Sequence, residues 1–385
     1  MYFSRLKKRR GGQIRAVDFV VSLFLFLLML SQLILLVINI QIRISSSAID
    51  TVAFEELDIF GRQLLLEEGD QDWGYYQALP STFGLADSNE NTYLTLDGAK
   101  IARIITGTPN PVGVVSGYEM YDYSTLKETI GLQSDFDFQI GLYPLLYPDI
   151  SVSSNNFAEV SVKNIYDIPT SDVRVHFFTI DLTNGEVISE GETLTNSDGD
   201  TSLQLSDPTA SIQGGEHFVF IIVEKGPLWG MNWGFNDPTS DEVVFGASST
   251  TTIWGGAIHS TSLLVTDILA VTPDSHFLSI IYQNSTSGYS NKTINLATAL
   301  DGNETISIPN EGLVAFISVA RNDNQYQVGI GSYPAILDRD SSDGSFYQVF
   351  GELEIGSKTK SLLSKIYPVN VRSTLMSFQL TLWRN

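Results

Sequence analysis

The sequence contains no cysteine and only four histidines among its 385 residues. Without cysteine the chain has neither a disulfide framework nor thiolate metal sites. The histidines, His176, His217, His259 and His276, are scattered and form no HExxH or His-x-His pair. A zinc site of the usual spacing is therefore not predicted, and a structural or surface role is expected for each histidine.

Basic residues are also scarce. The chain has 22 Lys and Arg against 44 Asp and Glu, a formal net charge of −22. Because nucleic-acid binding requires a basic face, this balance argues against a nucleic-acid partner. The sequence also lacks a Walker loop, a G-x-S-x-G elbow and a strand–GxGxxG–helix unit. No catalytic site and no cofactor are predicted, and a surface hydrolase is the least favoured class.

The chain does have one long apolar run. From Phe19 to Ile38 only Ser22, Ser31 and Gln32 interrupt it. About 20 such residues suffice for a helix to cross the hydrocarbon core of a bilayer. The run predicts a single transmembrane helix within 13–68, whose later part is amphipathic until Glu67-Glu68-Gly69 stops it.

Residues before this run predict the topology. The leader, residues 1–12, and the residues just after it carry only basic charges: Arg5, Lys7, Lys8, Arg9, Arg10 and Arg15. The positive-inside rule therefore predicts a cytoplasmic N-terminus, an anchor in contact with membrane lipids, and an extracellular C-terminal ectodomain. A secretory signal cleaved near Ser46-Ser47-Ala48 is the alternative, but secretory apolar regions are shorter than this one.

A basic leader ending in Gly12-Gln13, followed by this helix, resembles the archaeal type IV pilin-like proteins with class III signal peptides. The resemblance implies cleavage between Gly12 and Gln13 by a class III signal peptidase, and association with pilin-like subunits through the helix. Gly11 stands where that family usually has a basic residue. Asp18 is sixth, not fifth, after the implied cut, and is expected either to contact a subunit or to lie at the membrane boundary.

Later segments extend the resemblance. They are Trp73 with the turn at Pro80–Gly84, Leu96-Asp97-Gly98-Ala99-Lys100, Tyr123-Ser124-Thr125-Leu126-Lys127 with Gly131-Leu132, and the ending Leu380–Trp383. None of these is a catalytic signature. Ser124 is expected to cap a short helix, which Gly131 would close in the left-handed conformation.

The fold class expected for the chain is α+β and mostly β. A small mixed α/β region at 69–148 follows the helix, then an immunoglobulin-like β-sandwich at 149–226 and a C-terminal β-rich domain at 227–385. Within the sandwich, the segment from Asn196 to Thr201 is predicted to be a hairpin turn, with a cation loop as the alternative. The aromatic segment from Gly226 to Gly234 is expected to be a connector between domains or a glycan-contacting loop.

Three glycosylation sequons begin at Asn284, Asn291 and Asn303, close together in a region expected to be exterior. Two functions are therefore expected. The first is a membrane-anchored, non-catalytic surface protein resembling an archaeal pilin or minor pilin. The second is a single-pass adhesion or ligand-binding protein that is not assembled into a filament.

Overall fold

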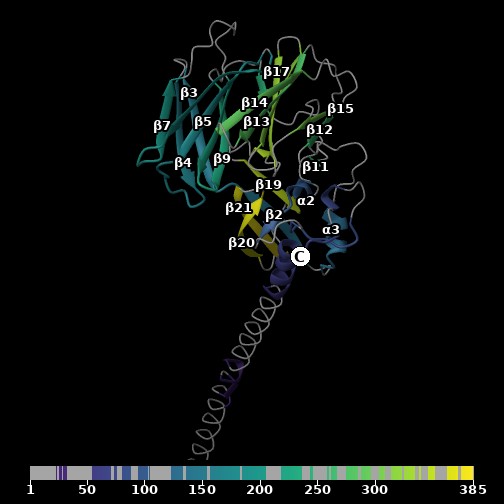
Figure 1. The fold of residues 1–385 in the computed structure, drawn as a ribbon. Helices are drawn as coiled ribbons and strands as arrows, with labels where there is room; N and C mark the ends of the chain where they lie inside the picture. Colours follow the sequence, from purple (N-terminus) through teal and green to yellow (C-terminus); the bar gives the residue numbers. More distant parts are fainter. Residues whose placement is uncertain are drawn as a thin grey trace, which may run out of the picture. The chain divides into compact units, whose positions relative to one another are not determined.

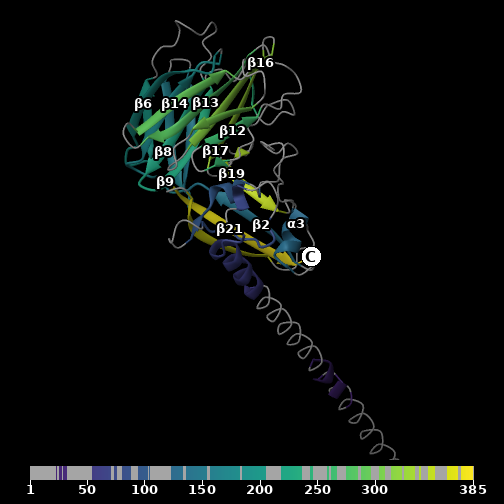
Figure 2. The ribbon, with the colours of Figure 1, turned by 45° about the vertical axis from the view of Figure 1, so that its right-hand side comes forward.

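The structure is a computed structural model in which the chain forms two compact units, Met1–Glu56 and Leu57–Asn385. It describes residues 23, 26–27, 29–32, 54–70, 73–75, 80–87, 94–102, 104, 123–132, 136–153, 157–182, 184–204, 218–235, 243–245, 258–259, 262–266, 275–284, 288–295, 303–307, 314–322, 325–333, 338–339, 346–351, 362–371 and 374–384. Figures 1 and 2 show the ribbon from two directions.

Few residues of the first unit are described. Leu23, Phe26, Leu27, Met29 and Leu30 are helical, and their side chains are between 42% and 72% exposed. Among the described residues, no helix is long and apolar enough to span a bilayer. Most of the predicted transmembrane run lies outside the described residues, as do Gly12, Gln13 and Asp18.

The second unit is mostly β and is built around a 10-stranded sheet. In order, this sheet contains β18 (Asp338–Arg339), β19 (Phe346–Gly351), β2 (Phe136–Tyr143), β21 (Thr374–Arg384), β9 (Leu228–Phe235), β8 (Phe218–Lys225), β5 (Arg174–Ile180) and β6 (Val187–Leu194), while β20 (Leu362–Val371) pairs with β21 and with β1 (Thr95–Leu96). Strands β21 and β9 share one register pair, Leu375 with Leu228. The sheet is thus two parts joined at that point, visible as the lower and upper strands of Figure 1.

The upper part of this sheet forms a β-sandwich with a three-stranded sheet. That smaller sheet contains β3 (Leu146–Ser153), β4 (Phe157–Asn164) and β7 (Asp200–Gln204). Alternate residues of both sheets point inward and form one core cluster: Leu146, Ala158, Val160, Val162, Val173, Val175, Phe177, Val219, Ile221 and Val223. The alternation typical of a sandwich is therefore present in β4 and β7, as the sequence predicts.

The other face of β5 and β8 is covered as well. A five-stranded sheet packs against it, made of β10 (Val243–Phe245), β17 (Gln325–Tyr333), β16 (Val314–Asn322), β13 (Ser275–Asn284) and β14 (Gly288–Asn295). Tyr289 of β14 contacts Phe178 of β5, with ring centroids 5.8 Å apart. Because both faces are covered, β8 reads Phe-Val-Phe-Ile-Ile-Val without alternation, and all six of these side chains are buried. A small sheet of β11 (Ile258–His259), β12 (Ser262–Thr266) and β15 (Asn303–Ser307) completes the described strands.

The strand pairing joins segments that the expected domain borders separate. Strand β9 follows the border at 226/227, yet it pairs along its length with β8 of the sandwich. Strands β19 and β21, from the end of the chain, pair with β2 on either side. The α/β region therefore includes the C-terminal strands, and the five-stranded sheet is inserted between β9 and β19 in the sequence.

One expected loop is a strand. The sequence predicts that the segment from Gly226 to Gly234 is a connector or a glycan-contacting loop, but Leu228–Phe235 is strand β9, and the prediction is wrong there. A Cβ on Gly230 would lie 2.1 Å from the carbonyl oxygen of Leu146, and one on Gly234 would lie 2.8 Å from Val152. These glycines allow β3 to cross closely over β9, and Asn232 fixes the crossing by donating to the carbonyl of Pro148 at 2.7 Å.

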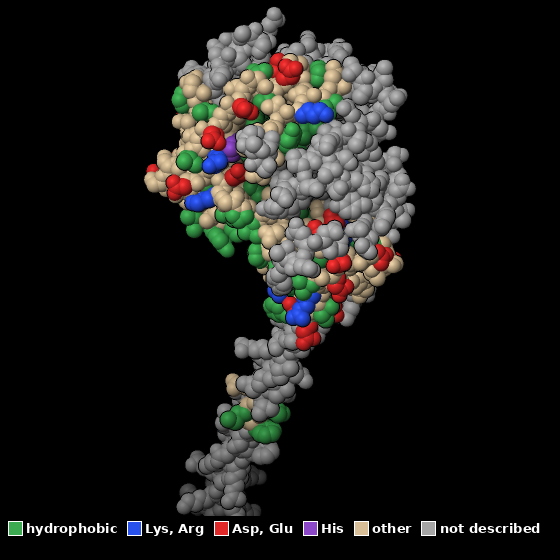
Figure 3. Space-filling view, in the orientation of Figure 1, with side chains coloured by type: hydrophobic (Ala, Val, Ile, Leu, Met, Phe, Trp, Pro, Cys, Tyr) green, Lys and Arg blue, Asp and Glu red, His purple; other side chains and the backbone are tan. Residues whose placement is uncertain are grey.

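The short helices lie beside the lower part of the large sheet. They are η1 (Trp73–Tyr75), α2 (Gly98–Ala102) and α3 (Tyr123–Thr129). Helix α3 begins at Tyr123, so Ser124 lies inside it and is not its cap. Gly131 closes α3 with φ +67°, as predicted. On the face seen in Figure 3, acidic side chains are spread over the described surface.

Candidate functional site: the helix seat

A helix that ends at residue 66 packs within the second unit. Residues 57–66, called here the seated helix, carry four almost fully buried apolar side chains, Leu57, Phe60, Leu64 and Leu65. Their spacing places them on one face of an α-helix. The ring of Phe60 meets that of Phe138 on β2 edge to face, with centroids 4.9 Å apart. The amphipathic pattern predicted from the sequence is therefore buried against the sheet.

Exposed residues of this helix make charged contacts beside the buried face. The carboxylate of Asp58 lies 2.9 Å from Arg62 and 2.8 Å from Lys365 of β20. The hydrogen bond from Lys365 is the main reason why the pKa of Asp58 is below its ordinary value. Since these groups are exposed, they orient the helix more than they stabilise it.

A buried lysine holds the end of the seated helix. Lys100 of α2 is fully buried, and its ammonium group donates to the carbonyls of Glu68 at 2.9 Å and Ala86 at 2.8 Å. Residues 85 and 86 also donate their backbone N–H groups to the carbonyls of Leu64 and Glu67. The carbonyls at the helix C-terminus are thereby paired, and a positive charge lies at the negative end of the helix dipole.

Trp73 and Gly84 also lie against the chain at the C-terminal end of the seated helix. The indole N–H of Trp73 donates to the carbonyl of Gly84 at 2.9 Å, and the Trp73 side chain is fully buried. A Cβ on Gly84 would lie 2.0 Å from the carbonyl oxygen of Glu67, so only glycine fits there. The helix stop predicted at Glu67-Glu68-Gly69 is confirmed, since Gly69 has φ +68°.

Helix α3 is attached to β2 by one carboxylate. Asp137 accepts hydrogen bonds from the hydroxyl of Tyr123 and the ammonium group of Lys127, both at 2.7 Å. The Lys127 and Asp137 side chains are only 19% and 12% exposed. In such a partly buried place a charge-assisted contact is worth more than on the surface.

Four residues of the sequence motifs make structural contacts in this region. Trp73 and Lys100 lie at the C-terminal end of the seated helix, whereas Tyr123 and Lys127 bind Asp137 of β2, the strand whose Phe138 contacts Phe60. We call this arrangement, formed by these residues with Gly84 and Asp137, the helix seat. These residues belong to sequence motifs, but no local pattern predicts that the motifs lie close together in the fold. In the described part of the chain, no group of three or more His, Asp or Glu could hold a metal ion.

The other predicted site residues lie elsewhere. Asn291 is an exposed residue of β14, Asn284 ends β13 and Asn303 begins β15. The three sequons thus lie on two different sheets, and their glycosylation stays a prediction.

The segment at Asn196 forms a turn, but the predicted hairpin is wrong, because the flanking strands β6 and β7 lie in different sheets and do not pair. The side-chain oxygen of Asn196 accepts hydrogen bonds from the N–H groups of Asp198 at 2.8 Å and Asp200 at 3.0 Å. Gly199 takes φ +81° within the turn. The amide oxygen that the alternative assigned to a cation is therefore used by the backbone.

A polar cluster lies between the sandwich and the five-stranded sheet. His176 of β5 is buried, and its ring nitrogens lie 3.6 Å from Glu224 and 3.8 Å from Glu192. The hydroxyl of Tyr289 donates a short hydrogen bond to Glu224. Burial acts to raise the pKa of Glu224, but His176 and Tyr289 outweigh it and hold this pKa below its ordinary value of 4.5. Burial, followed by the charge of Glu224, raises the pKa of Tyr289.

This cluster predicts a pH dependence of stability. A lowered carboxyl pKa stabilises the fold above the unfolded-state pKa, and this contribution is lost as the pH falls through the folded-state pKa. Replacing Glu224 with Gln is therefore expected to cost about 1–2 kcal/mol at neutral pH, and less below about pH 4. Urea unfolding of the full chain in detergent, between about pH 3 and 7, measures this difference. The exposed Glu190→Gln is the control, and equal pH profiles for both variants would refute the assignment.

Comparisons with known proteins identify no family for this chain. No family model matches the chain, and no curated protein matches it. Among solved structures, it is similar to the FN1–FN3 domains of chicken CNTN1 (9% identity, 49% of this chain and 68% of that chain, TM-score 0.17). It is also similar to a two-domain fibronectin type III segment of chicken tenascin (12%, 50% and 98%, TM-score 0.17). A third is trypsin-activated alpha-2-macroglobulin from Escherichia coli (11%, 59% and 18%, TM-score 0.20).

These scores are too low to carry an argument about function. The class of protein is defined by the described strands themselves. The chain is mostly β, and its second unit contains a β-sandwich.

Proposed function

We propose that this protein is a membrane-anchored, non-catalytic structural protein of the cell surface, of a kind resembling an archaeal type IV pilin or minor pilin. In this proposal the apolar run from Phe19 to Ile38 lies in the membrane, with the N-terminus in the cytoplasm and the β-rich unit outside. A class III signal peptidase cuts between Gly12 and Gln13, and the helix then packs with those of pilin-like subunits.

The helix seat is the observation that best supports the proposal. A filament subunit has to hold the end of its N-terminal helix firmly in its globular part. The four buried apolar side chains of the seated helix, the buried ammonium of Lys100 and the close contact of Gly84 with Glu67 hold residues 57–66 within the second unit. An independent globular domain on a flexible linker would need none of these contacts.

The alternative is a single-pass adhesion or ligand-binding protein that keeps its leader and does not join a filament. The outer face of the three-stranded sheet favours this function, because polar side chains of β3, β4 and β7 are exposed on it. Both functions require the anchor, and they differ in whether the leader is removed.

The anchor is tested by extraction of native membranes. The intact protein is expected to stay in the membrane pellet at alkaline pH, since about 20 apolar residues insert effectively irreversibly. Protease added to whole cells is expected to remove the β-rich unit. A variant that lacks residues 13–44 but keeps a secretory signal is expected in the soluble fraction. Release of the intact protein by alkali, or full protection from the external protease, would contradict the proposal.

A further inference from the structure

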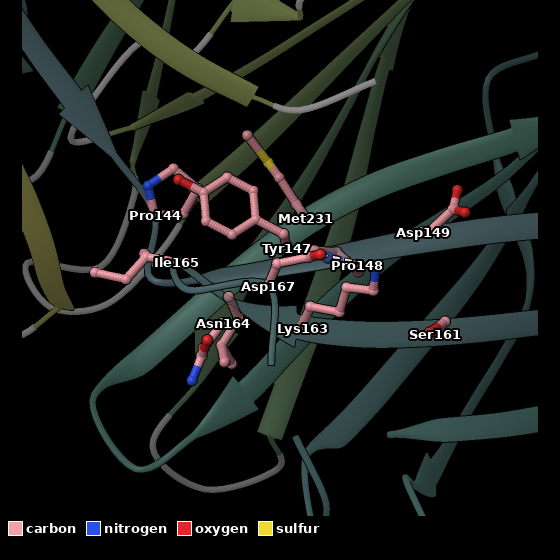
Figure 4. Close-up of a pocket in the computed structure, with 11 residues that line it drawn as sticks. Pro144, Tyr147, Pro148, Asp149, Ser161, Lys163, Asn164, Ile165, Asp167 and Met231 are labelled. Carbon is pink, nitrogen blue, oxygen red and sulfur yellow. Dashed lines mark ion pairs between the residues drawn. The ribbon is translucent and has the colours of Figure 1, made fainter. Parts of the chain in front are cut away.

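The outer face of the three-stranded sheet contains a long trough. Two hollows of about 530 and 510 Å³ adjoin there, and both are lined by Asp149 of β3 and Ser161 of β4. Figure 4 shows Tyr147, Pro144, Ile165 and Met231 at one end of the first hollow, and Asp149 and Ser161 at the other. Each hollow has the size of a small-molecule site.

The first end of the trough offers a flat apolar surface. Tyr147 is half-buried beside Pro144 and Ile165, so its ring is held in place while part of it stays exposed. Lys163 lies opposite Tyr147 in the β3–β4 register, and its ammonium group lies 2.7 Å from Asp167. Among the described residues that line this hollow, Lys163 is the only cation, and because its charge is paired with Asp167, an anionic ligand gains little from it.

The rest of the trough is an ordered array of hydroxyl and carboxylate groups. In the strand register, Asp149, Ser161 and Asp200 form one row across the sheet. The next row is Ser151, Glu159 and Ser202, on the same face. Neighbouring strands lie about 4.8 Å apart, so these side chains form a regular set of hydrogen-bond acceptors and small donors. Such a surface matches a chain of hydroxyl groups, and its charge repels acidic polymers.

A hydrogen-bonded turn carries a second aromatic residue, Tyr166, between Ile165 and Asp167, which line the first hollow. Tyr166 and Ile168 are 77% and 56% exposed. Their backbone N–H groups donate to the side-chain oxygen of Asn164 at 2.9 and 3.2 Å, and Asp167 has φ +60°. Because the turn is held by its own hydrogen bonds, little conformational freedom is lost when a ligand meets Tyr166.

We propose that this trough binds a neutral oligosaccharide. One sugar ring stacks on Tyr147, with Tyr166 on the adjoining turn. The carboxylates of Asp149, Glu159 and Asp200 accept hydrogen bonds from hydroxyl groups of the following rings. This binding is independent of leader cleavage and filament assembly, so it goes beyond the function proposed above.

The test uses the full chain in a detergent without a sugar headgroup. The probes are arrayed neutral tetra- to hexasaccharides, sulfated oligosaccharides and a lysine-rich peptide, with calorimetry on the best ligand. We expect a neutral oligosaccharide to bind, Tyr147→Ala to weaken it at least tenfold, and Asp149→Asn to weaken it severalfold. Tyr282→Ala, at a half-buried tyrosine of β13 in the five-stranded sheet, is the control and should leave affinity unchanged.

Three outcomes would overturn the proposal. The first is binding of the peptide or the sulfated probes alone, and the second is no binding of any neutral oligosaccharide at millimolar concentration. The third is equal affinity in Tyr147→Ala, Asp149→Asn and the wild type. If Tyr147→Ala does not fold, the exposed Tyr166→Ala replaces it, with an expected severalfold loss. Thermal melting of each variant confirms that the fold is intact.

Discussion

Replacing Lys100 with Met is expected to destabilise the second unit by about 3–5 kcal/mol. Methionine fills a similar volume but donates no hydrogen bond. The carbonyls of Glu68 and Ala86 would lose their shared donor, and the negative end of the helix dipole would lose its charge. Denaturant unfolding of the full chain in detergent measures the loss. Glu-C protease is also expected to cut faster after Glu67 or Glu68, directly after the C-terminal end of the seated helix.

Lys225→Met is the matched control for this experiment. The ammonium group of Lys225 also donates to a backbone carbonyl, that of Ser171 at 2.7 Å, but it does so at an exposed position. Water replaces that donor, so the expected cost is within about 0.5 kcal/mol. Equal losses of stability in the two variants would contradict the structural role assigned to Lys100.

Replacing Gly230 with Ala is expected to cost about 3 kcal/mol, at the upper end of the range for overpacking. The added Cβ would lie 2.1 Å from the carbonyl oxygen of Leu146 and 3.0 Å from the ring of Pro148. Strand backbones cannot move apart there without disturbing the hydrogen bond from Asn232 to Pro148. Thermal and urea unfolding measure the effect.

The control for Gly230 lies in the same sheet. A Cβ on Gly191 of β6 would meet only the end of the Leu203 side chain, at 3.1 Å. That methyl group can rotate away, so Gly191→Ala is expected to change stability by less than about 0.5 kcal/mol. A small effect at both glycines would mean that β3 and β9 are not in close contact.

Much of the sandwich could be predicted from the sequence. The sequence predicts strands at 158–165, 173–180, 186–194 and 217–223, and β4, β5, β6 and β8 lie within one or two residues of these segments, because alternation and continuous apolar runs are local signals. The turn at Asn196 was also predictable. An Asn side chain accepts hydrogen bonds from nearby backbone N–H groups, and Gly199 readily takes a positive φ.

Other strands could not be predicted because their sequence signals come from distant contacts. Strand β9 contains Gly230 and Gly234, which indicate a loop locally but here allow β3 to pass close by. Strand β20 contains Pro368, which argues against a strand although Pro368 pairs with Ser377 of β21. The pairing of β2 with β19 and β21 joins residues more than 200 positions apart, and no local pattern encodes it.

The helix seat was only partly predictable. The stop at Gly69 and the closing Gly131 are local features, and the structure has both. The buried charge of Lys100 was not predictable, because its partners are backbone carbonyls that have no sequence signature. The convergence of Trp73, Lys100 and Asp137 depends on the tertiary fold.

The central claim is that the mature protein begins at Gln13 and retains the apolar helix. The most direct test is the N-terminal residue of the protein recovered from native membranes, by intact-mass and terminal-peptide mass spectrometry. The account predicts a terminus at Gln13. A terminus at Met1 would contradict processing and favour the uncut adhesion protein. A terminus near Ile49 would contradict the anchor itself, because the apolar run would then be a discarded signal.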